Sequence, residues 1–125
     1  MNLIVIFSII FIHWVADFVL QTHWQATNKG KDIKALLAHT ATYALVWYSL
    51  GVLFVIFNLD NYHPWSLTLF ILITFVAHTI TDYFTSRLNN KLWVKGDVHN
   101  FFVSVGFDQV LHYVQLFLTF YFLTK

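Results

Sequence analysis

The sequence has no cysteine and very little charge. Without cysteine, the chain can form no disulfide, no thiolate metal site and no cysteine nucleophile. Charged residues make up 10% of its 125 residues, against about 25% in an ordinary soluble domain, whereas hydrophobic residues make up 58%. A soluble core of this size could not bury so much apolar surface, and the excess would cause aggregation. The composition therefore predicts a single domain, residues 1–125, with lipid as its solvent.

Several function classes lack their usual signatures. The seven lysine and arginine residues form no cluster, so the sequence predicts no nucleic-acid partner. There is no Gly-rich phosphate loop, no nucleophile elbow and no Ser-His-Asp order. The first apolar run has no basic segment before it and no small-residue cleavage site after it, and we expect it to be a retained helix.

Four apolar segments are long enough to cross a membrane. About 20 helical residues span the hydrocarbon, and the backbone of each span must satisfy its hydrogen bonds internally. We therefore expect an all-α polytopic membrane protein, built as a four-transmembrane-helix bundle. The predicted spans are Leu3–Leu20, Ala35–Phe57, Trp65–Ser86 and Phe101–Thr124.

The basic residues set the predicted orientation. The connections 21–34 and 87–100 lie on the same side, because two spans separate them. They hold six of the seven basic residues, and the connection 58–64 between the other spans holds none. The positive-inside rule then places these two connections in the cytoplasm and both termini outside.

The acidic residues form an unusual pattern. The chain has no glutamate, and three of its six aspartates lie inside the predicted spans. Each has a histidine four residues away, a spacing that places both side chains on one helix face. The remaining span carries a single histidine, His39. The three pairs are His13 with Asp17, His78 with Asp82, and Asp108 with His112.

These seven residues also share one depth. At about 1.5 Å per residue, they lie roughly 5–16 Å from the cytoplasmic ends of their helices. An ionised aspartate at the bilayer centre costs roughly 3 kcal/mol, and the spans contain no lysine or arginine to pair with one. Imidazole and carboxylate are ligands for zinc, manganese and iron. The pattern predicts one or two divalent ions, with zinc the first choice, held by His13, Asp17, His39, His78, Asp82, Asp108 and His112.

Two further features accompany these pairs. "HWVADFVLQ" aligns with "HTITDYFTS", and each is followed by a Lys-Gly pair, Lys29–Gly30 or Lys95–Gly96, and by a helix with a histidine. This weak repeat predicts two parallel helix pairs around an axis along the membrane normal. Gln21 and Gln109 lie beside the cluster and either hydrogen-bond the metal ligands or join helices. Tyr43 is interpreted as packing.

Together the motifs carry a resemblance. "HWVADFVLQ", "LLAHTATY", "HTITDY" and "FDQVLH" resemble a family of small bacterial and phage membrane proteins known as domain of unknown function 3307. The resemblance covers nearly the whole chain and implies a compact helical domain in the bacterial inner membrane, with no established activity. The layout of His- and Asp-bearing helices is more distantly similar to membrane-bound metal-dependent hydrolases.

Our first functional hypothesis is a metal-dependent hydrolase. A metal-bound water would be the nucleophile, and Asp108 would be the general base. The other two span aspartates, Asp17 and Asp82, complete the predicted catalytic carboxylates. The substrate would be a membrane lipid or another amphiphile that enters from the cytoplasmic leaflet. A di-iron oxidative enzyme is a variant of this hypothesis.

Two rival hypotheses use the same residues differently. Buried His/Asp chains also relay protons or ions in transporters, but the outer half of these spans is almost uniformly apolar. Four helices are also few for alternating access, unless the chain forms a homo-oligomer. In the other rival hypothesis the protein is a scaffold, and the cluster only fixes helix register.

Overall fold

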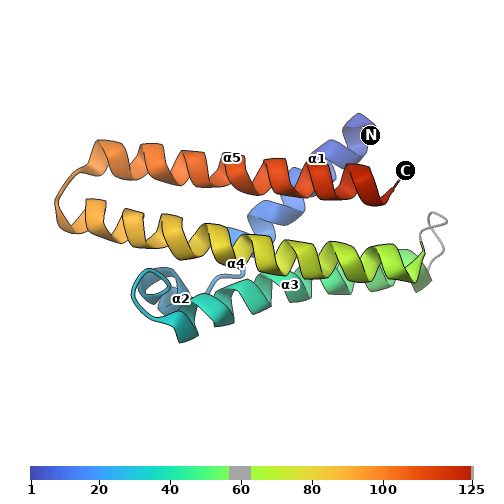
Figure 1. The fold of residues 1–125 in the computed structure, drawn as a ribbon, viewed down its shortest axis with the longest axis horizontal. Coiled ribbons are helices and arrows are strands. Elements are labelled where there is room, and N and C mark those ends of the chain that lie inside the picture. Colours follow the sequence, from blue (N-terminus) through green and yellow to red (C-terminus); the bar gives the residue numbers. More distant parts are fainter. Residues whose placement is uncertain (57–62, 125) are drawn as a thin grey trace.

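The protein is entirely helical in the residues that the computed structural model describes, 1–56 and 63–124. Phe57, the last residue of the second predicted span, and most of the connection 58–64 lie outside these residues. The three longest helices run side by side, and α1 crosses them obliquely (Figure 1). The elements are α1 (Leu3–Trp14), the π-helical turn η1 (Val15–Val19), α2 (His23–Asn28), α3 (Ile33–Ile56), α4 (Pro64–Val94) and α5 (Val98–Leu123).

Three of these helices are long and apolar enough to cross a membrane. They are α3, α4 and α5, and α1 with η1 forms a shorter apolar helix over Leu3–Val19. Large hydrophobic side chains are exposed along all of them, as expected for a protein surrounded by lipid. The all-α prediction is confirmed for the described residues, and the helices support an integral membrane protein.

The first helix changes its winding at the predicted His/Asp pair. After Trp14 the chain makes one wide turn, η1, in which the Leu20 amide donates to the carbonyl of Val15 at 3.0 Å. The turn buries Ala16 and Asp17 against the bundle. Such π turns are rare and concentrate at functional sites. The apolar pattern predicted a regular helix here and carried no signal for the wider turn.

The first predicted connection contains a helix of its own. Thr22 and Gln25 form a capping box at the start of α2, with the Gln25 amide donating to Thr22 Oγ1 at 3.2 Å and the Thr22 amide donating to Gln25 Oε1 at 3.0 Å. The Gln25 side chain also donates to Thr42 Oγ1 on α3 at 3.3 Å. The short helix is therefore fastened to α3 rather than free in the interface.

The other basic connection is mostly helical. Helix α4 continues to Val94, beyond the predicted end of the third span, and α5 begins at Val98. Gly96 makes the turn with a φ of 73°, a conformation that glycine adopts without strain. Asp97 caps α5, and hydrogen bonds from the side chain and backbone of Asn100 hold the pKa of Asp97 below its usual value.

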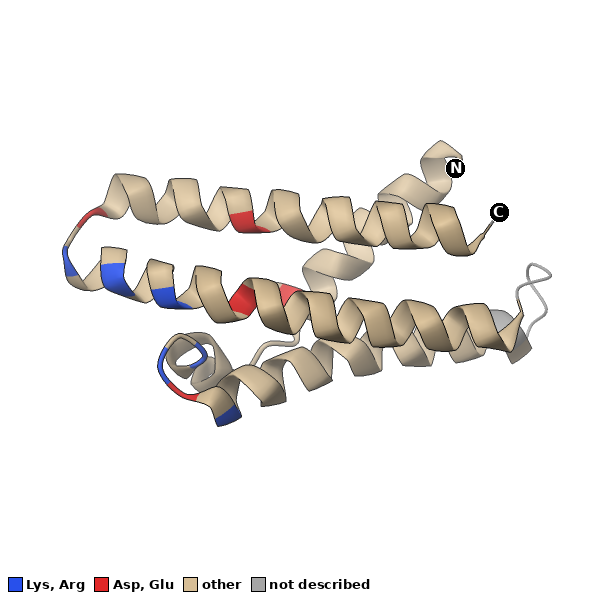
Figure 2. Ribbon diagram, in the orientation of Figure 1, with Lys and Arg blue, Asp and Glu red and all other residues tan. Residues whose placement is uncertain are grey.

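Charge is separated along the bundle. Among the described residues, every lysine and arginine lies at or near the end that holds α2 and the α4–α5 turn, whereas the N- and C-termini lie at the other end (Figure 2). The two basic connections therefore share one end, as the parity of the spans predicts. The apolar core packs toward the end with the termini, around Ile9, Trp47 and Leu116.

Candidate metal centre

The seven predicted residues meet in one buried cluster. His13 and Asp17 come from α1 and η1, His39 from α3, His78 and Asp82 from α4, and Asp108 and His112 from α5. None of the seven is more than 8% exposed. Residues from five elements thus bring three carboxylates and four imidazoles together inside an apolar bundle.

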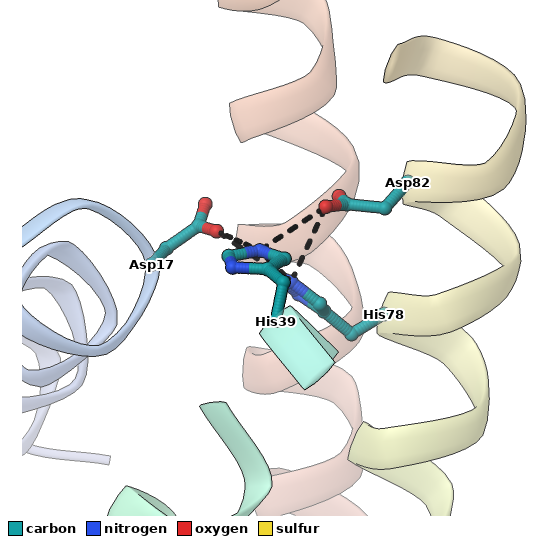
Figure 3. A group of neighbouring side chains, drawn as sticks. All are labelled: Asp17, His39, His78 and Asp82. Atoms are coloured by element: carbon teal, nitrogen blue, oxygen red, sulfur yellow. Dashed lines mark hydrogen bonds and ion pairs between the residues drawn. The ribbon is translucent and has the colours of Figure 1, made fainter. Parts of the chain in front are cut away.

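Four of these residues direct one atom each at a common point. This four-residue group comprises Asp17, His39, His78 and Asp82, whose ligand atoms all lie within 4.8 Å of one another (Figure 3). His39 Nε2 is 3.0 Å from Asp17 Oδ1, 3.2 Å from Asp82 Oδ2 and 3.3 Å from His78 Nε2. His78 Nε2 is 3.5 Å from Asp17 Oδ1 and 3.7 Å from Asp82 Oδ2.

These separations fit a tetrahedral cation site. With metal–ligand bonds of about 2.0–2.1 Å, the ligand atoms of a tetrahedral zinc lie about 3.3–3.4 Å apart. Asp17 Oδ1 is buried and has no hydrogen-bond partner in the part of the chain that the structure describes, although His39 Nε2 is only 3.0 Å away. The outward nitrogens of His39 and His78 also find no acceptor among the described residues, whereas metal-bound imidazoles usually have one.

A second group shares Asp17 with the first. It contains Asp17, Asp108 and His112, again with ligand atoms within 4.8 Å. His112 Nε2 lies between two carboxylates, 3.0 Å from Asp82 Oδ1 and 3.4 Å from Asp108 Oδ2. Thr85 donates to the other oxygen of Asp108 at 2.6 Å. Asp108 is thus fixed next to the four-residue group without belonging to it.

His13 belongs to neither group. Its Nδ1 is 2.8 Å from the Tyr43 hydroxyl and its Nε2 is 2.8 Å from Gln109 Oε1, so both ring nitrogens are occupied by hydrogen bonds. Gln109 Nε2 in turn donates to Asp17 at 3.3 Å and to Asp108 at 3.1 Å. His13 therefore supports the cluster through hydrogen bonds instead of directing a nitrogen at the four-residue group.

The two glutamines beside the cluster behave differently. Gln109 on α5 joins His13 on α1 to the carboxylate of Asp17, so it fits both alternatives that the sequence left open: it hydrogen-bonds a candidate metal ligand and it joins helices. The side-chain oxygen of Gln21 makes no such bond, because it is buried and has no hydrogen-bond partner among the described residues.

Two stacked rings fix the orientation of the His78 imidazole. One of its faces stacks on Tyr43, with ring centroids 3.9 Å apart and an interplanar angle of 13°. His112 also stacks on it, at 4.1 Å and 26°. Tyr43 therefore does more than pack, because it orients one imidazole of the four-residue group and hydrogen-bonds His13.

Lys29 is the site residue that the sequence analysis missed. Its ammonium donates to Asp82 Oδ2 at 2.9 Å and to His39 Nε2 at 3.2 Å. The predicted spans contain no lysine or arginine. The inference that their aspartates therefore lack a basic partner was wrong, because Lys29 reaches Asp82 from the end of α2. The only signal was the Lys-Gly pair of the repeat, and its counterpart Lys95 is exposed.

The backbone around Lys29 packs tightly against α4. A Cβ added at Gly30 would lie 2.6 Å from the Ser86 carbonyl oxygen, and the Ser86 hydroxyl donates to the Lys29 carbonyl at 3.3 Å. Only glycine allows this approach. Burial lowers the pKa of the Lys29 amine, but Asp82 and Asp17 raise it by more, so the amine is held above its ordinary 10.5 and stays charged.

We expect Gly30→Ala to destabilise the protein by about 1–3 kcal/mol, because the backbone at Ser86 must move to admit the methyl group. Gly106→Ala is the matched control, since nothing lies within 4 Å of its Cβ position inside α5. That change should be neutral or stabilising by up to about 1 kcal/mol. The free energies of unfolding in detergent would be compared, and equal effects of the two changes would contradict the close approach.

The cluster carries more negative than positive charge. Three carboxylates and the ammonium of Lys29 sum to two negative charges, counting the imidazoles as neutral. Protonated imidazoles or a bound cation would offset this charge. The two Nε2 atoms of His39 and His78 are 3.3 Å apart, and two imidazolium rings would repel at that distance. Added protons are therefore disfavoured on this pair of rings together, which leaves a metal ion between them or a proton on His112, 3.0 Å from Asp82 Oδ1.

Comparison with known proteins gives one match. The model of a family described as a protein of unknown function, DUF3307, matches residues 5–125. No curated protein and no solved structure matched the chain.

Proposed function

The chain belongs to DUF3307, a family of proteins of unknown function, and we propose that it is an integral membrane hydrolase that uses one divalent metal ion. The observation that carries the proposal is the spacing of the four ligand atoms of Asp17, His39, His78 and Asp82. Two imidazoles and two carboxylates suit zinc first, and manganese or iron as alternatives. The carboxylates of the cluster supply the negative charge that a bound ion would offset.

Asp108 is the residue we assign as general base. A metal ion held by the four-residue group would need a fifth, open coordination position to bind a water molecule and lower its pKa. Asp108 stands beside this group, and Thr85 and Gln109 fix its two oxygens. His112 is 3.4 Å from Asp108 and 3.0 Å from Asp82, so it can pass a proton away from Asp108.

A lipid or similar amphiphile is the substrate class that the surroundings favour. A groove of about 480 Å³ runs between the α1–η1 segment and α3, with room for a hydrocarbon chain. None of the seven cluster residues lines the groove, but Ile12 and Thr42 in its wall directly precede His13 and Tyr43 in the chain. Its lining is almost entirely apolar: Phe11, Ile12, Val15, Thr42, Leu45, Val46, Ser49 and Leu50.

The proposed membrane arrangement completes the function. We place α1 with η1 as the first of four spans and the basic end of the bundle in the cytoplasm of a bacterium, with both termini outside. The distribution of lysine and arginine in Figure 2 supports this orientation. The substrate would then reach the cluster from the cytoplasmic leaflet of the inner membrane.

Asp108→Asn should separate metal binding from catalysis. Asp108 does not belong to the four-residue group, so we expect the variant to bind metal like the wild type. Without its general base it should turn over at least about 100-fold more slowly. The measurement is the release of lipid fragments from zinc-loaded proteoliposomes made with mixed bacterial lipids, followed by mass spectrometry.

The control is Asp32→Asn, in a connection outside the cluster, which should leave both properties unchanged. Lipid products that form at the same rate in wild type and Asp108→Asn would remove Asp108 from the mechanism. If metal-loaded wild type releases no product from any lipid class, the result counts against a hydrolase. A pH-driven proton flux in the same vesicles would instead favour the hypothesis that the cluster relays protons in a transporter.

A further inference from the structure

Lys29 and a metal ion would compete for the same two atoms. The ammonium donates to Asp82 Oδ2 and to His39 Nε2, and both atoms belong to the four-residue group. The structure therefore already holds a cation at the edge of the site that the proposed function assigns to a divalent ion.

At His39 the two cations exclude each other. A neutral imidazole has one nitrogen with a lone pair and one with a hydrogen. The ammonium has no acceptor, so its 3.2 Å contact with His39 Nε2 is a hydrogen bond in the tautomer whose Nε2 carries the lone pair. A metal ion bound by His39 Nε2 needs this same lone pair. Coordination by His39 thus requires that the ammonium of Lys29 leave the nitrogen.

Distance leads to the same conclusion. Asp82 Oδ2 and His39 Nε2 are 3.2 Å apart, and the ammonium is 2.9 and 3.2 Å from them. An ion bonded to both atoms at about 2.1 Å could be no more than about 4 Å from the ammonium nitrogen, by simple triangle geometry. A divalent ion and an ammonium repel strongly at this separation in a buried site.

The lysine can leave without unfolding its surroundings. Its backbone is fixed by Gly30 and Ser86 on α4, so any movement is confined to the side chain. The side chain is 20% exposed, and Lys29 directly follows α2, which lies at the basic end of the bundle (Figure 2). Rotation of its flexible four-carbon stem would carry the ammonium to the membrane interface.

We propose that Lys29 is a tethered cation that fills the edge of the four-residue group when no metal is bound, and that a divalent ion displaces its ammonium toward the interface. This inference rests on the proposed metal site and adds a competitor to it. Lys29 neutralises Asp82 in the metal-free protein, and metal binding frees it.

Chemical labelling of the amine tests the displacement. Metal-free wild type in detergent would be treated briefly with an acetylating reagent at increasing zinc concentration, and each lysine would be read by peptide mass spectrometry. We expect the labelling rate of Lys29 to rise at least about tenfold, because the amine loses its buried partners. The rise should follow the zinc that is bound, measured separately by elemental mass spectrometry. Exposed Lys91 and Lys95 should not change.

Lys29→Met provides the second measurement. Removal of the competitor should raise the zinc affinity at least about tenfold, whereas Lys34→Met, which removes a lysine outside the cluster, should leave it unchanged. The displacement of Lys29 is overturned if zinc binds without changing the labelling of Lys29, or if it binds the wild type and Lys29→Met with equal affinity. Either result would still support the metal site. Zinc binding by neither wild type nor variant overturns both. Zinc binding by the variant alone still supports the competition.

Discussion

Asp82→Asn is expected to reduce bound metal from about one equivalent to under about a tenth of one, the largest change that a single atom replacement should cause here. The Asp82 carboxylate has more charged and imidazole neighbours than any other group we describe in the cluster. Oδ2 is near Lys29, His39 and His78, and Oδ1 is 3.0 Å from His112. An asparagine amide is neutral and a poor ligand for zinc, so the site loses both a bond and a charge.

The experiment compares metal content at equal helicity. Wild type, Asp82→Asn and the control Asp32→Asn would be purified without added metal, loaded with zinc and analysed by elemental mass spectrometry. Circular dichroism would show that each is folded at the temperature used. We expect one equivalent in the wild type and in the control. Retention of a full equivalent by Asp82→Asn would remove Asp82 from the ligand set and with it the four-residue site.

Chelation should lower the unfolding temperature of the wild type by about 10 °C. An ion present at 100 times its dissociation constant stabilises the folded state by about 2.7 kcal/mol. For a chain of this size, each kcal/mol shifts the midpoint by about 4 °C. The ion would join η1, α3 and α4, which are otherwise held by apolar packing and a few hydrogen bonds.

Thermal unfolding in detergent, followed by circular dichroism, measures this effect. The midpoint would be recorded for zinc-loaded protein, after chelation and after zinc is returned. Asp82→Asn is the matched control, because a variant that holds no ion should not respond to the chelator. An unchanged midpoint in the wild type, together with no bound metal, would favour the scaffold in which the cluster is purely structural.

The half of the bundle that holds the termini bears on the transport hypothesis. A cavity of about 370 Å³ lies toward the end with the termini, between α1, α3, α4 and α5. No aspartate, histidine, lysine or arginine lines it, and most of its walls are apolar. A relay of protons from the cluster to the outer surface would need ionisable groups or ordered water along such a path. The described residues thus favour a site that is open to one side only.

Much of the site could be predicted from the sequence because it depends on short-range geometry. The spacing in His13–Asp17, His78–Asp82 and Asp108–His112 is fixed by helix winding, so each pair shares a face whatever the fold. The three pairs indeed lie 3.4–3.7 Å apart. Hydropathy likewise marked the helices, because lipid requires long apolar segments with internal backbone hydrogen bonds.

Only the tertiary structure decided which atoms of different helices meet. Rotation of each helix about its axis sends His39 into the four-residue group and leaves His13 with Tyr43 and Gln109, although spacing alone gave both histidines the same role. Helix rotation is set by packing across the whole bundle, which no local pattern encodes. Lys29 reaches the cluster because Gly30 closely approaches Ser86, which is 56 positions away in the chain. This contact between distant residues makes a loop lysine part of a buried site.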